Sequence, residues 1–445
     1  MRTRANESLA SLCSATERSG FGTAPPGPGT APSGPGPGSA RTGAALFGTL
    51  DPEAVDADVP GAVDGALAAV LRERAADAVA IDHTFATDLA ERVARFTLSG
   101  GKRTRSQFLW WGMRACAGGT TAAEVAAALR IAAGLELLQT CALVHDDVMD
   151  GSPLRRGRPA VHADLTAQYG AGSDDGATEP FGRAAAILAG DLALAWADDT
   201  VTETDLAPDP RRRVDGIWRA MRTEMVAGQY LDLHNQVTRS RSREQAIRTA
   251  SLKSGRYSVE RPLTLGAALA GADEPTGRAL GAAGRCAGIA FQLGDDLLGV
   301  FGDPDRTGKP SGDDIREGKL TYLVAVARAR AEDAGDEAAG ALLDRSLGDA
   351  GLSDDDVDRV REVLVTTGAR AAVEAEIGRL AADSARHLDE AGVEPGAGGR
   401  LRDLVGAIAG ERAAAGRPCG PGTAGGGGGP GGEATDTRTA GGGSR

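Results

Sequence analysis

Apolar residues recur at three- and four-residue spacing through most of the chain, from about residue 55 to residue 410. Two clear examples are AAEVAAALRIAAGLELLQTCALVHDD at 122–147 and REQAIRTASLKSGRYSVERPLTLGAALAG at 243–271. This spacing follows the 3.6-residue turn of an α-helix and predicts helices that bury one face or are buried all round. Alternating patterns typical of strands are scarce. We therefore predict an all-α fold of many packed helices.

The helical pattern stops at the two ends of the chain, where Gly and Pro accumulate. Residues 21–40 contain 6 Gly and 6 Pro, and residues 416–445 contain 13 Gly and 3 Pro. Such stretches have too little apolar surface to offset the entropy lost on ordering them. We predict a disordered Pro/Gly-rich tail at 1–45, one helical domain at 46–415, and a disordered Gly-rich tail at 416–445. A short polar segment at 172–180 is predicted to be a surface loop.

Charge and cysteine content narrow the class of protein. The formal net charge of −13 argues against general nucleic-acid binding through a basic surface. The chain shows neither a secretory signal nor a run of about 18 apolar residues, so we expect no transmembrane segment. The five cysteines have no CxxC spacing, which favours a reducing cytoplasm over a disulfide framework or a zinc cluster.

Acidic residues gather at the end of one strongly apolar pattern, in LVHDDVMDGSPLRRGRP. Asp146 and Asp150 lie one helical turn apart on the same face, with Asp147 beside them. Three close carboxylates repel one another unless a cation neutralises them, and oxygen ligands suit Mg²⁺. A solvated acidic helix end is the alternative interpretation of this cluster taken alone.

A second acidic cluster ends another apolar pattern about 150 residues later, in GIAFQLGDDLLGVFGD. Asp295 and Asp296 would be costly at the end of a buried helix unless they have partners. Two such helices facing each other would hold a metal and a diphosphate between them. This pairing favours a functional interpretation of both clusters.

Basic residues stand in the breaks beside these acids. GGKRTR at 100–105 precedes an apolar helix, Arg155 and Arg156 follow the first cluster, and Lys309 and Lys319 follow the second. Helix N-termini, Arg forks and Lys ammonium groups all bind phosphate oxygens. Neither Gly-Lys segment matches the spacing of a nucleotide P-loop. Any one of these cations taken singly is explained as well by a surface charge.

Taken in order, these motifs resemble those of the trans-isoprenyl diphosphate synthases, also called the polyprenyl synthetase family. The motifs are GGKRTR, DDVMD with its trailing RRGRP, LKS at 252–254, and FQLGDDLLGVFGD with its trailing GK…D…GK. The resemblance runs from about residue 90 to 325 by motif. It implies an isoprenoid synthase-type helical bundle with a central active-site cavity. It also implies a homodimeric prenyltransferase that joins isopentenyl diphosphate to an allylic diphosphate.

The resemblance assigns roles to individual residues. The Mg²⁺ ligands would be Asp146, Asp150 and Asp295, supported by Asp147 and Asp296. Together with the allylic diphosphate they would hold three ions. The cations that bind the allylic diphosphate would be Arg155, Lys253 and Lys309. The catalytic residues would be these two lysines and the five aspartates Asp146, Asp147, Asp150, Asp295 and Asp296. Isopentenyl diphosphate would be held by Lys102, Arg105, Gln139 and Arg156. The site would be completed by Ser254, Gln292 and Lys319.

Two positions bear on activity and product. The second motif usually ends in Asp, whereas this chain has Gly299; because Asp295 remains, we expect activity to be retained.

The growing chain should run along the helix upstream of Asp146, past Ala142 and Cys141 and then Leu138. Ala142 and Cys141 are small where farnesyl-producing relatives often carry aromatics, which favours geranylgeranyl diphosphate. Leu138 or the tryptophans at 110 and 111 would form the floor, although core packing explains the tryptophans equally well.

Alternatives remain open from the sequence. The product is alternatively farnesyl diphosphate or a longer polyprenyl diphosphate. A class I terpene cyclase shares the helices, DDxxD and Mg²⁺, but has no need of GGKRTR or of the second acidic pair with its lysines. A catalytically inactive modulatory subunit is favoured only by Gly299. A structural helical bundle with incidental acidic clusters would bind no diphosphate in the presence of Mg²⁺.

Overall fold

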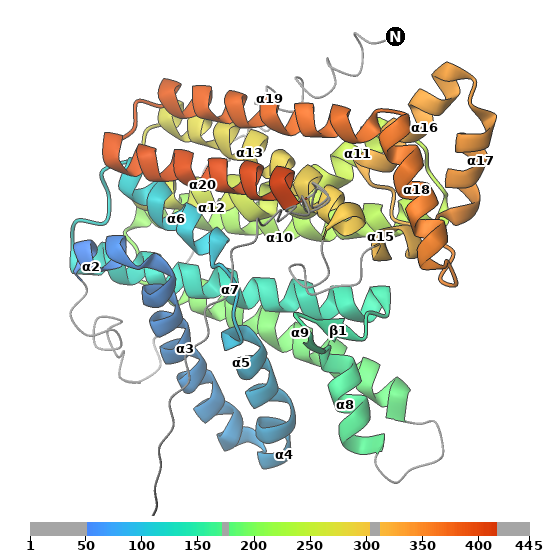
Figure 1. The fold of residues 1–445 in the computed structure, drawn as a ribbon. Coiled ribbons are helices and arrows are strands. Elements are labelled where there is room, and N and C mark those ends of the chain that lie inside the picture. The colour runs from blue at the N-terminus through green and yellow to red at the C-terminus, as the bar shows by residue number, and fades with distance from the viewer. Residues whose placement is uncertain (1–50, 171–177, 303–311, 416–445) are drawn as a thin grey trace, which may run out of the picture.

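The fold is built almost entirely of helices, which confirms the all-α prediction (Figure 1). This computed structural model describes residues 51–170, 178–302 and 312–415. The predicted tails at 1–45 and 416–445 lie outside the described residues, so the predicted domain boundaries stay predictions.

The N-terminal half holds the longest helix and a short hairpin. Its elements are α2 (Pro52–Ala57), α3 (Val59–Ile81), α4 (His83–Phe85), the π-helix η2 (Ala86–Ala90), α5 (Glu91–Leu98), α6 (Thr104–Ala115), α7 (Ala122–Asp150), β1 (Leu154–Arg155), β2 (Arg158–Pro159), α8 (Val161–Gly170), α9 (Thr178–Thr202) and α10 (Pro208–Val237). The C-terminal half has α11 (Arg243–Ala250), the π-helix η3 (Ser251–Glu260), α12 (Arg261–Leu269), α13 (Glu274–Phe301), α15 (Asp313–Arg316), α16 (Tyr322–Ala334), α17 (Glu337–Ser346), α18 (Asp354–Thr366), α19 (Ala369–Glu390) and α20 (Pro395–Ala415).

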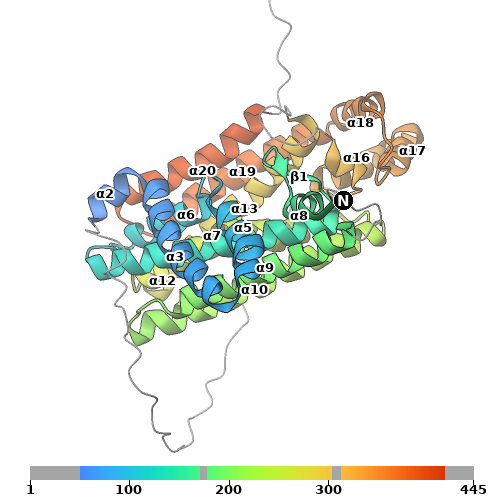
Figure 2. The ribbon, with the colours of Figure 1, turned by 90° about the horizontal axis from the view of Figure 1, so that it is seen from below.

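Helix α7 runs through the middle of the molecule, with α3 and α9 packed on one side and α6 on another (Figures 1 and 2). A capping box starts it: the Thr121 hydroxyl accepts from the Glu124 amide while the Glu124 carboxylate accepts from the Thr121 amide. It ends at Gly151, whose left-handed conformation suits a helix C-terminus. The first aspartate cluster therefore occupies the last turns of α7, as its sequence position predicts.

Helix α7 is also the one described helix that is long and apolar enough to cross a membrane. However, 83% of its most apolar window is buried inside the fold. The core helix of a globular protein passes the same test of length and composition. Among the described residues, this buried helix is the one candidate that stands against the expectation of no transmembrane segment.

A two-residue hairpin follows α7 and turns the chain back on itself. β1 and β2 are antiparallel, with Arg155 opposite Arg158. Arg156 and Gly157 between them both have positive φ, 54° and 71°, which is the geometry of a tight type I′ turn. This turn fixes Arg155 close to the end of α7 that carries the aspartates.

The π-helix η3 packs between α10 and α13 at very short backbone distances. A Cβ on Gly228 of α10 would overlap the backbone of Lys253, and one on Gly288 of α13 would overlap the carbonyl of Gly255. Only glycine allows these two approaches. The position of η3, and of the lysine near its start, is therefore fixed by backbone contacts.

A set of buried ion pairs, which we call the structural network, holds the far end of η3. It consists of Glu224, Arg256, Glu260, Arg261 and Arg285. Two N–H groups of Arg261 reach Glu224 at 2.8 and 2.5 Å, and two of Arg285 reach Glu260 at 3.2 and 3.0 Å. These bidentate pairs tie η3 and α12 to α10 and α13.

Candidate active site

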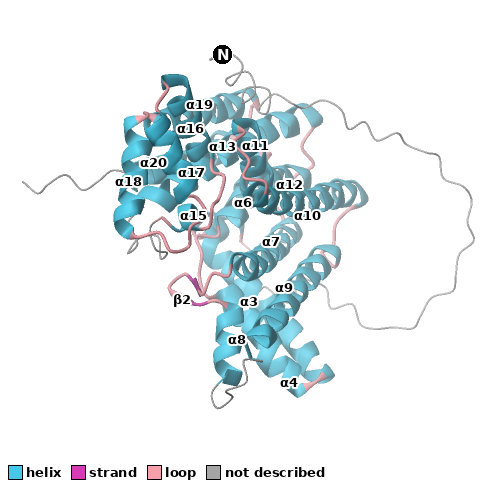
Figure 3. Cartoon of the chain, turned by 90° about the vertical axis from the view of Figure 1, so that its right-hand side faces the viewer, coloured by secondary structure: helices cyan, strands magenta, loops and turns pink. Residues whose placement is uncertain are grey.

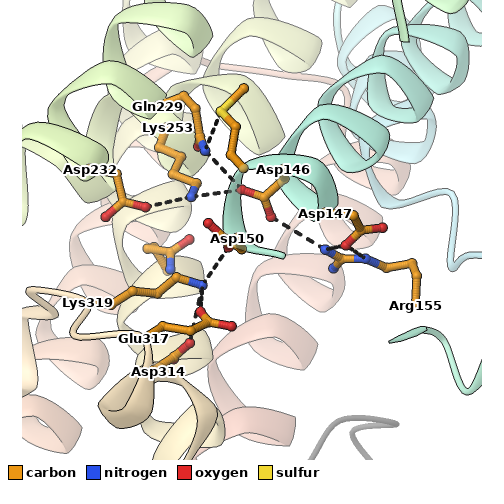
Figure 4. Close-up of polar contacts among 12 residues, drawn as sticks. Asp146, Asp147, Asp150, Arg155, Gln229, Asp232, Lys253, Asp314, Glu317 and Lys319 are labelled. Carbon is orange, nitrogen blue, oxygen red and sulfur yellow. Dashed lines mark hydrogen bonds and ion pairs between the residues drawn. The ribbon is translucent and has the colours of Figure 1, made fainter. Parts of the chain in front are cut away.

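A cavity of about 1450 Å³ opens beside α7 and is lined by residues of α6, α7, α10, η3 and α13. Its polar end lies where α7 and α13 carry their aspartates, and Figure 4 shows those of α7 with the cations that they contact. Beyond that end the wall is mostly apolar, with Ala142, Leu194, Met225 and Phe291 among its members. The cavity therefore joins a charged region to a largely apolar one.

Asp146 is the centre of the polar end. Its Oδ1 accepts from Lys253 Nζ at 3.2 Å and from Gln229 Nε2 at 3.1 Å, while Lys253 also reaches Asp232 at 2.7 Å. Burial by itself would raise the pKa of Asp146, but Lys253, Lys319 and Arg155 outweigh it and lower that pKa to about 2. Asp146 is thus an anion held by cations from three elements.

Asp147 lies behind Asp146 and faces away from the cavity. Its side chain is 1% exposed and binds the Arg155 guanidinium through Oδ1, at 2.8 Å from Nε. Arg155 Nη2 also lies 3.5 Å from Asp146. Asp147 therefore fixes the direction of Arg155, which itself lines the cavity.

Asp150 is the third acid of the first cluster and binds Lys319. The Lys319 ammonium lies 3.0 Å from Asp150, 2.5 Å from Glu317 and 3.6 Å from Asp314. Burial lowers the pKa of Lys319, but these surrounding carboxylates more than reverse the effect and raise it above its ordinary value. The charged Lys319 ammonium therefore links Asp150 of α7 to Asp314 of α15.

The second acidic pair, Asp295 and Asp296 of α13, lines the same cavity. Gln292 donates to Asp296 Oδ1 at 2.9 Å. Burial raises the pKa of Asp296 to about 7; the Gln292 hydrogen bond works against this, and the neighbouring Asp314 and Asp295 charges add to it. Asp296 is therefore a buried carboxylate with two other carboxylates beside it, and both burial and their charges oppose its ionisation.

Position 299, where the second motif lacks its usual acid, is filled from another segment. A Cβ on Gly299 would overlap the carboxylate of Asp314, which comes from α15. Asp314 also lines the cavity. The space above Gly299 is therefore already taken by a carboxylate.

Cations gather at the start of α6. Lys102 and Arg105 line the cavity, and Arg105 donates to Ser258 Oγ at 2.8 Å while its guanidinium lies 4.4 Å from the centre of the Tyr257 ring. Arg156 donates to the Gly100 carbonyl at 2.7 Å. Burial, followed by the like charge of Arg103, lowers the pKa of Arg156. Mutually repelling cations favour an anion between them.

Gln139 of α7 lies at the same side of the cavity. Its Oε1 is buried and accepts no hydrogen bond from any described residue. A buried carbonyl oxygen without a donor costs free energy, which a bound molecule carrying a donor would recover.

The donor set fits Mg²⁺ in chemistry, although it is not gathered around one point. Among the described residues, no three His, Cys, Asp or Glu side chains lie close enough to hold an ion together. The carboxylates of Asp146 and Asp295 nonetheless face one cavity from two helices. Mg²⁺ prefers oxygen ligands, binds through one or two carboxylates, and takes its other ligands from water and substrate phosphates.

The cavity wall contains most of the residues chosen from the sequence. These are Lys102, Arg105, Gln139, Cys141, Ala142, Asp146, Arg155, Lys253, Ser254, Gln292, Asp295, Asp296 and Lys319. Asp147, Asp150 and Arg156 lie behind it and contact wall residues or the glycine loop. Lys309 falls outside the described residues.

Leu138 does not lie where the sequence placed it. It is fully buried in the main core cluster and is not part of the cavity wall. Its neighbours Gln139, Cys141 and Ala142 on the same helix do line the cavity, so Leu138 lies on the face of α7 that packs into the core. The tryptophans at 110 and 111 are also core residues and not its floor.

Sequence reasoning missed two residues of α10, Gln229 and Asp232. They are three positions apart, so they share one face of the helix, and both contact the Asp146–Lys253 pair. The signal that was available is GQYLD, in which Gly228 precedes two polar residues at this spacing. We use the name cavity network for Asp146, Gln229, Asp232, Lys253, Asp150 and Lys319.

Known proteins match both the sequence and the fold. The profile described as polyprenyl synthetase matches residues 87–363. A (2E,6E)-farnesyl diphosphate synthase of Mycobacterium tuberculosis is 32% identical over 274 residues, which cover 62% of this chain and 71% of that protein. A geranylfarnesyl diphosphate synthase of Aeropyrum pernix is also 32% identical, over 61% of this chain and 77% of its own.

A solved structure extends the match to most of the fold. The crystal structure of geranylgeranyl pyrophosphate synthase from Corynebacterium glutamicum, complexed with isoprenyl diphosphate and magnesium, superposes with a TM-score of 0.74. It is 38% identical and covers 79% of this chain and 98% of its own.

Proposed function

The chain belongs to the polyprenyl synthetase family and is a prenyltransferase, and we propose that its product is geranylgeranyl diphosphate. In this proposal it adds isopentenyl diphosphate to an allylic diphosphate, head to tail and in the trans configuration, until the chain has 20 carbons. The number of Mg²⁺ ions, three, and the assignment of each site residue are part of the proposal.

The charged end of the cavity carries the ionisation step. Arg155, Lys253 and the sequence-assigned Lys309 hold the allylic diphosphate and stabilise the charge that develops as the carbon–oxygen bond breaks. Asp146, Asp150 and Asp295 would hold Mg²⁺, which when bound supplies further positive charge to the leaving group. Lys319 keeps Asp150 in place through its 3.0 Å ion pair.

The start of α6 carries the second substrate. Lys102, Arg105 and Arg156 bind isopentenyl diphosphate, and the unsatisfied Oε1 of Gln139 marks the same side of the cavity. Holding both substrates in one cavity converts a bimolecular addition into a local one. The apolar wall keeps water from the carbocation until the new carbon–carbon bond has formed and the released diphosphate has accepted a proton from the adduct.

The length of the cavity is the observation that carries the choice of product. Along α10 its wall runs from Asp232 beside Lys253 to Arg219. These residues are thirteen positions apart, which at the α-helical rise is about 20 Å. An extended isoprene unit adds four bonds of about 1.5 Å, or about 5 Å of length, so four units fill about 20 Å.

Product analysis tests the proposal. The full chain is incubated with Mg²⁺, isopentenyl diphosphate and each allylic primer in turn, and products are identified by mass spectrometry. We expect geranylgeranyl diphosphate. A main product of 15 carbons, or of more than 20, would contradict the product choice. A hydrocarbon or alcohol formed without isopentenyl diphosphate would indicate a cyclase, and no turnover would indicate an inactive subunit.

We also propose that the enzyme is a homodimer. Large apolar side chains are exposed on α9 (Ile187, Leu188) and on α10 (Val226, Tyr230). Figure 3 shows these two helices on one side of the molecule. A second copy covering this side would remove apolar surface from water. Light scattering after gel filtration should give twice the chain mass, and a monomer at micromolar concentration would contradict the proposal.

A further inference from the structure

The basic segment GGKRTR at 100–105 contains one cation that does not face the cavity. Of its three cations, the first and the third line the cavity wall, whereas Arg103 does not, and its side chain is only 3% exposed. Its guanidinium donates to Asp64 of α3 at 2.7 Å, to Glu136 of α7 at 2.9 Å and to the carbonyl of Thr97 in α5 at 3.1 Å. Arg103 therefore binds three helices of the protein itself.

Glu136 is the buried partner of this arginine and makes a second contact. Its Oε2 accepts from Arg103, and its Oε1 accepts from the hydroxyl of Ser106 in the first turn of α6 at 2.7 Å. Glu136 lies three residues before Gln139 on α7, so the two share one side of that helix. One buried carboxylate therefore connects the start of α6 to the turn of α7 that carries Gln139.

The backbone of the basic segment has a conformation that few residues adopt. Arg103 has a φ of 48° and a ψ of 34°, in the left-handed region that is unfavourable for a residue with a Cβ. Gly100 and Gly101 also have positive φ, at 106° and 128°. Such a backbone persists where surrounding contacts hold it, and the contacts of Arg103 do so directly before α6. Lys102 lies within this stretch and lines the cavity.

The charges around Gly101 explain why Arg103 needs a buried acid. A Cβ built on Gly101 would lie 3.5 Å from Nη2 of Arg156 and 3.8 Å from Nη1 of Arg103, so two guanidinium groups flank one residue. After burial, the charge of Arg103 is the largest cause that lowers the pKa of Arg156, and the charge of Glu136 works in the opposite direction. Because Glu136 neutralises it, Arg103 can stay beside the cations of the cavity.

We propose that Arg103 and Glu136 are positioning residues for isopentenyl diphosphate. Their buried ion pair holds the backbone of 100–105 in the conformation that presents Lys102 and Arg105 to the diphosphate, while neither residue contacts the substrate. The inference rests on the proposed function and adds the residues that keep this substrate site formed before it is occupied. Without the ion pair, the binding-competent conformation is populated only part of the time, and the apparent affinity falls by the same fraction.

The test is Glu136→Gln, which keeps side-chain size and removes the charge. We expect the KM for isopentenyl diphosphate to rise about tenfold, which corresponds to a binding-competent segment present about one tenth of the time. The kcat and the KM for the allylic diphosphate should change by less than about twofold, because the cations assigned to that substrate lie on other segments. Calorimetric titration of the full chain with isopentenyl diphosphate alone should show the same loss of affinity without turnover.

The matched control is Glu260→Gln, which also breaks a buried pair of glutamate and arginine but lies outside the cavity wall. It should lower stability and leave the affinity for isopentenyl diphosphate unchanged. If Glu136→Gln folds poorly, Arg103→Gly/Glu136→Gln replaces it. This double variant leaves no unpaired buried charge, since Asp64 is 54% exposed, and glycine adopts the left-handed conformation freely. It should show the same loss of affinity.

The outcomes separate the inference from the proposed function. If the unaltered chain binds isopentenyl diphosphate and the folded variant binds it equally well, the inference is wrong while the proposed function stands. If Glu260→Gln loses as much affinity, or the KM for the allylic diphosphate rises as steeply, the ion pair has only a general structural role and the inference is again wrong. If the unaltered chain binds no isopentenyl diphosphate, the proposed function fails and the inference fails with it.

Discussion

On one side of η3, Lys253 reaches Asp146 and Asp232 at the wall of the cavity, while on the other side Arg256 and Glu260 are locked into the structural network. Both networks pair acids with cations from several helices. They differ in the cation: the cavity network contains the ammonium groups of Lys253 and Lys319, with the Arg155 guanidinium beside it at 3.5 Å from Asp146, whereas the structural network contains guanidinium groups alone. They also differ in access, since only the first lines a cavity.

This difference indicates what each network is for. A guanidinium binds a carboxylate through two parallel N–H groups and fixes its geometry, as Arg285 does with Glu260. An ammonium is a point charge whose three donors can exchange one acceptor for another. In the proposed function, the lysines of the cavity network exchange carboxylate partners for diphosphate oxygens, while the buried guanidinium groups of the structural network keep theirs.

The largest expected effect comes from Asp146→Asn in the cavity network. Because this change removes a proposed Mg²⁺ ligand and the main acceptor of Lys253, kcat should fall about 10³-fold, the scale seen when a preorganised electrostatic contact is lost. The melting temperature should fall, because cations lower the pKa of Asp146 to about 2 and its anion therefore stabilises the fold, but it should fall less than in Glu260→Gln, because Lys253 keeps Asp232 as a partner. Steady-state kinetics and thermal melts are measured together. A large loss of stability would mean that the two networks do not differ in role.

Glu260→Gln tests the other side of the comparison. It leaves Arg285 buried without its carboxylate, and breaking a buried pair in this way costs about 3–5 kcal/mol of unfolding free energy. Urea titration of the full chain measures the loss. The matched control is Glu274→Gln, whose carboxylate is 83% exposed and pairs with Arg278; it should change stability very little. A folded Glu260→Gln enzyme with unaltered stability but no activity would reverse our assignment.

Gly299→Asp sharpens the comparison by adding an acid to the cavity without removing one. If only the number of acids mattered, restoring the usual motif would raise activity. Because the Asp314 carboxylate already occupies this space, we expect activity to fall about tenfold through overpacking, which costs about 1–3 kcal/mol. The double variant Gly299→Asp/Asp314→Ala should recover part of the loss. Higher activity in the single variant would show that the overlap is easily relieved.

Gln229→Ala should give the smallest effect. It removes one neutral donor to Asp146 at 3.1 Å but leaves Lys253 in place, so kcat/KM should fall about fivefold, in line with about 1 kcal/mol for a single hydrogen bond. Substrate titrations measure this change. A loss as large as that of Asp146→Asn would mean that Gln229, and not Lys253, controls the position of Asp146.

Much of this could be predicted from the sequence because it is local. The apolar periodicity predicts α7 and α13, and the aspartate clusters mark their last turns. Bringing Lys253 to Asp146 across 107 positions required the family resemblance, since no helical spacing connects them. The long-range contact itself depends on how η3 packs between its neighbours.

The errors of prediction have physical causes too. Leu138 was placed in the cavity wall because helix spacing says which residues share a face, but not which neighbouring element meets that face. Asp232 was overlooked because its partner lies on another helix. The π-helical geometry of η3 adds about one residue per turn relative to an α-helix, and the apolar pattern around Ser251–Glu260 gives no sign of it.

The backbone contacts of η3 also bear on how the sequence can drift over evolutionary time. Gly228 and Gly288 let η3 contact α10 and α13 backbone to backbone, so these contacts help to position the start of η3, which carries Lys253. We therefore expect Leu, Val and Ala in the surrounding core to tolerate exchange for one another while the charged site keeps its position. Deep mutational scanning should accordingly show broad tolerance around η3, interrupted by sharp intolerance at these two glycines.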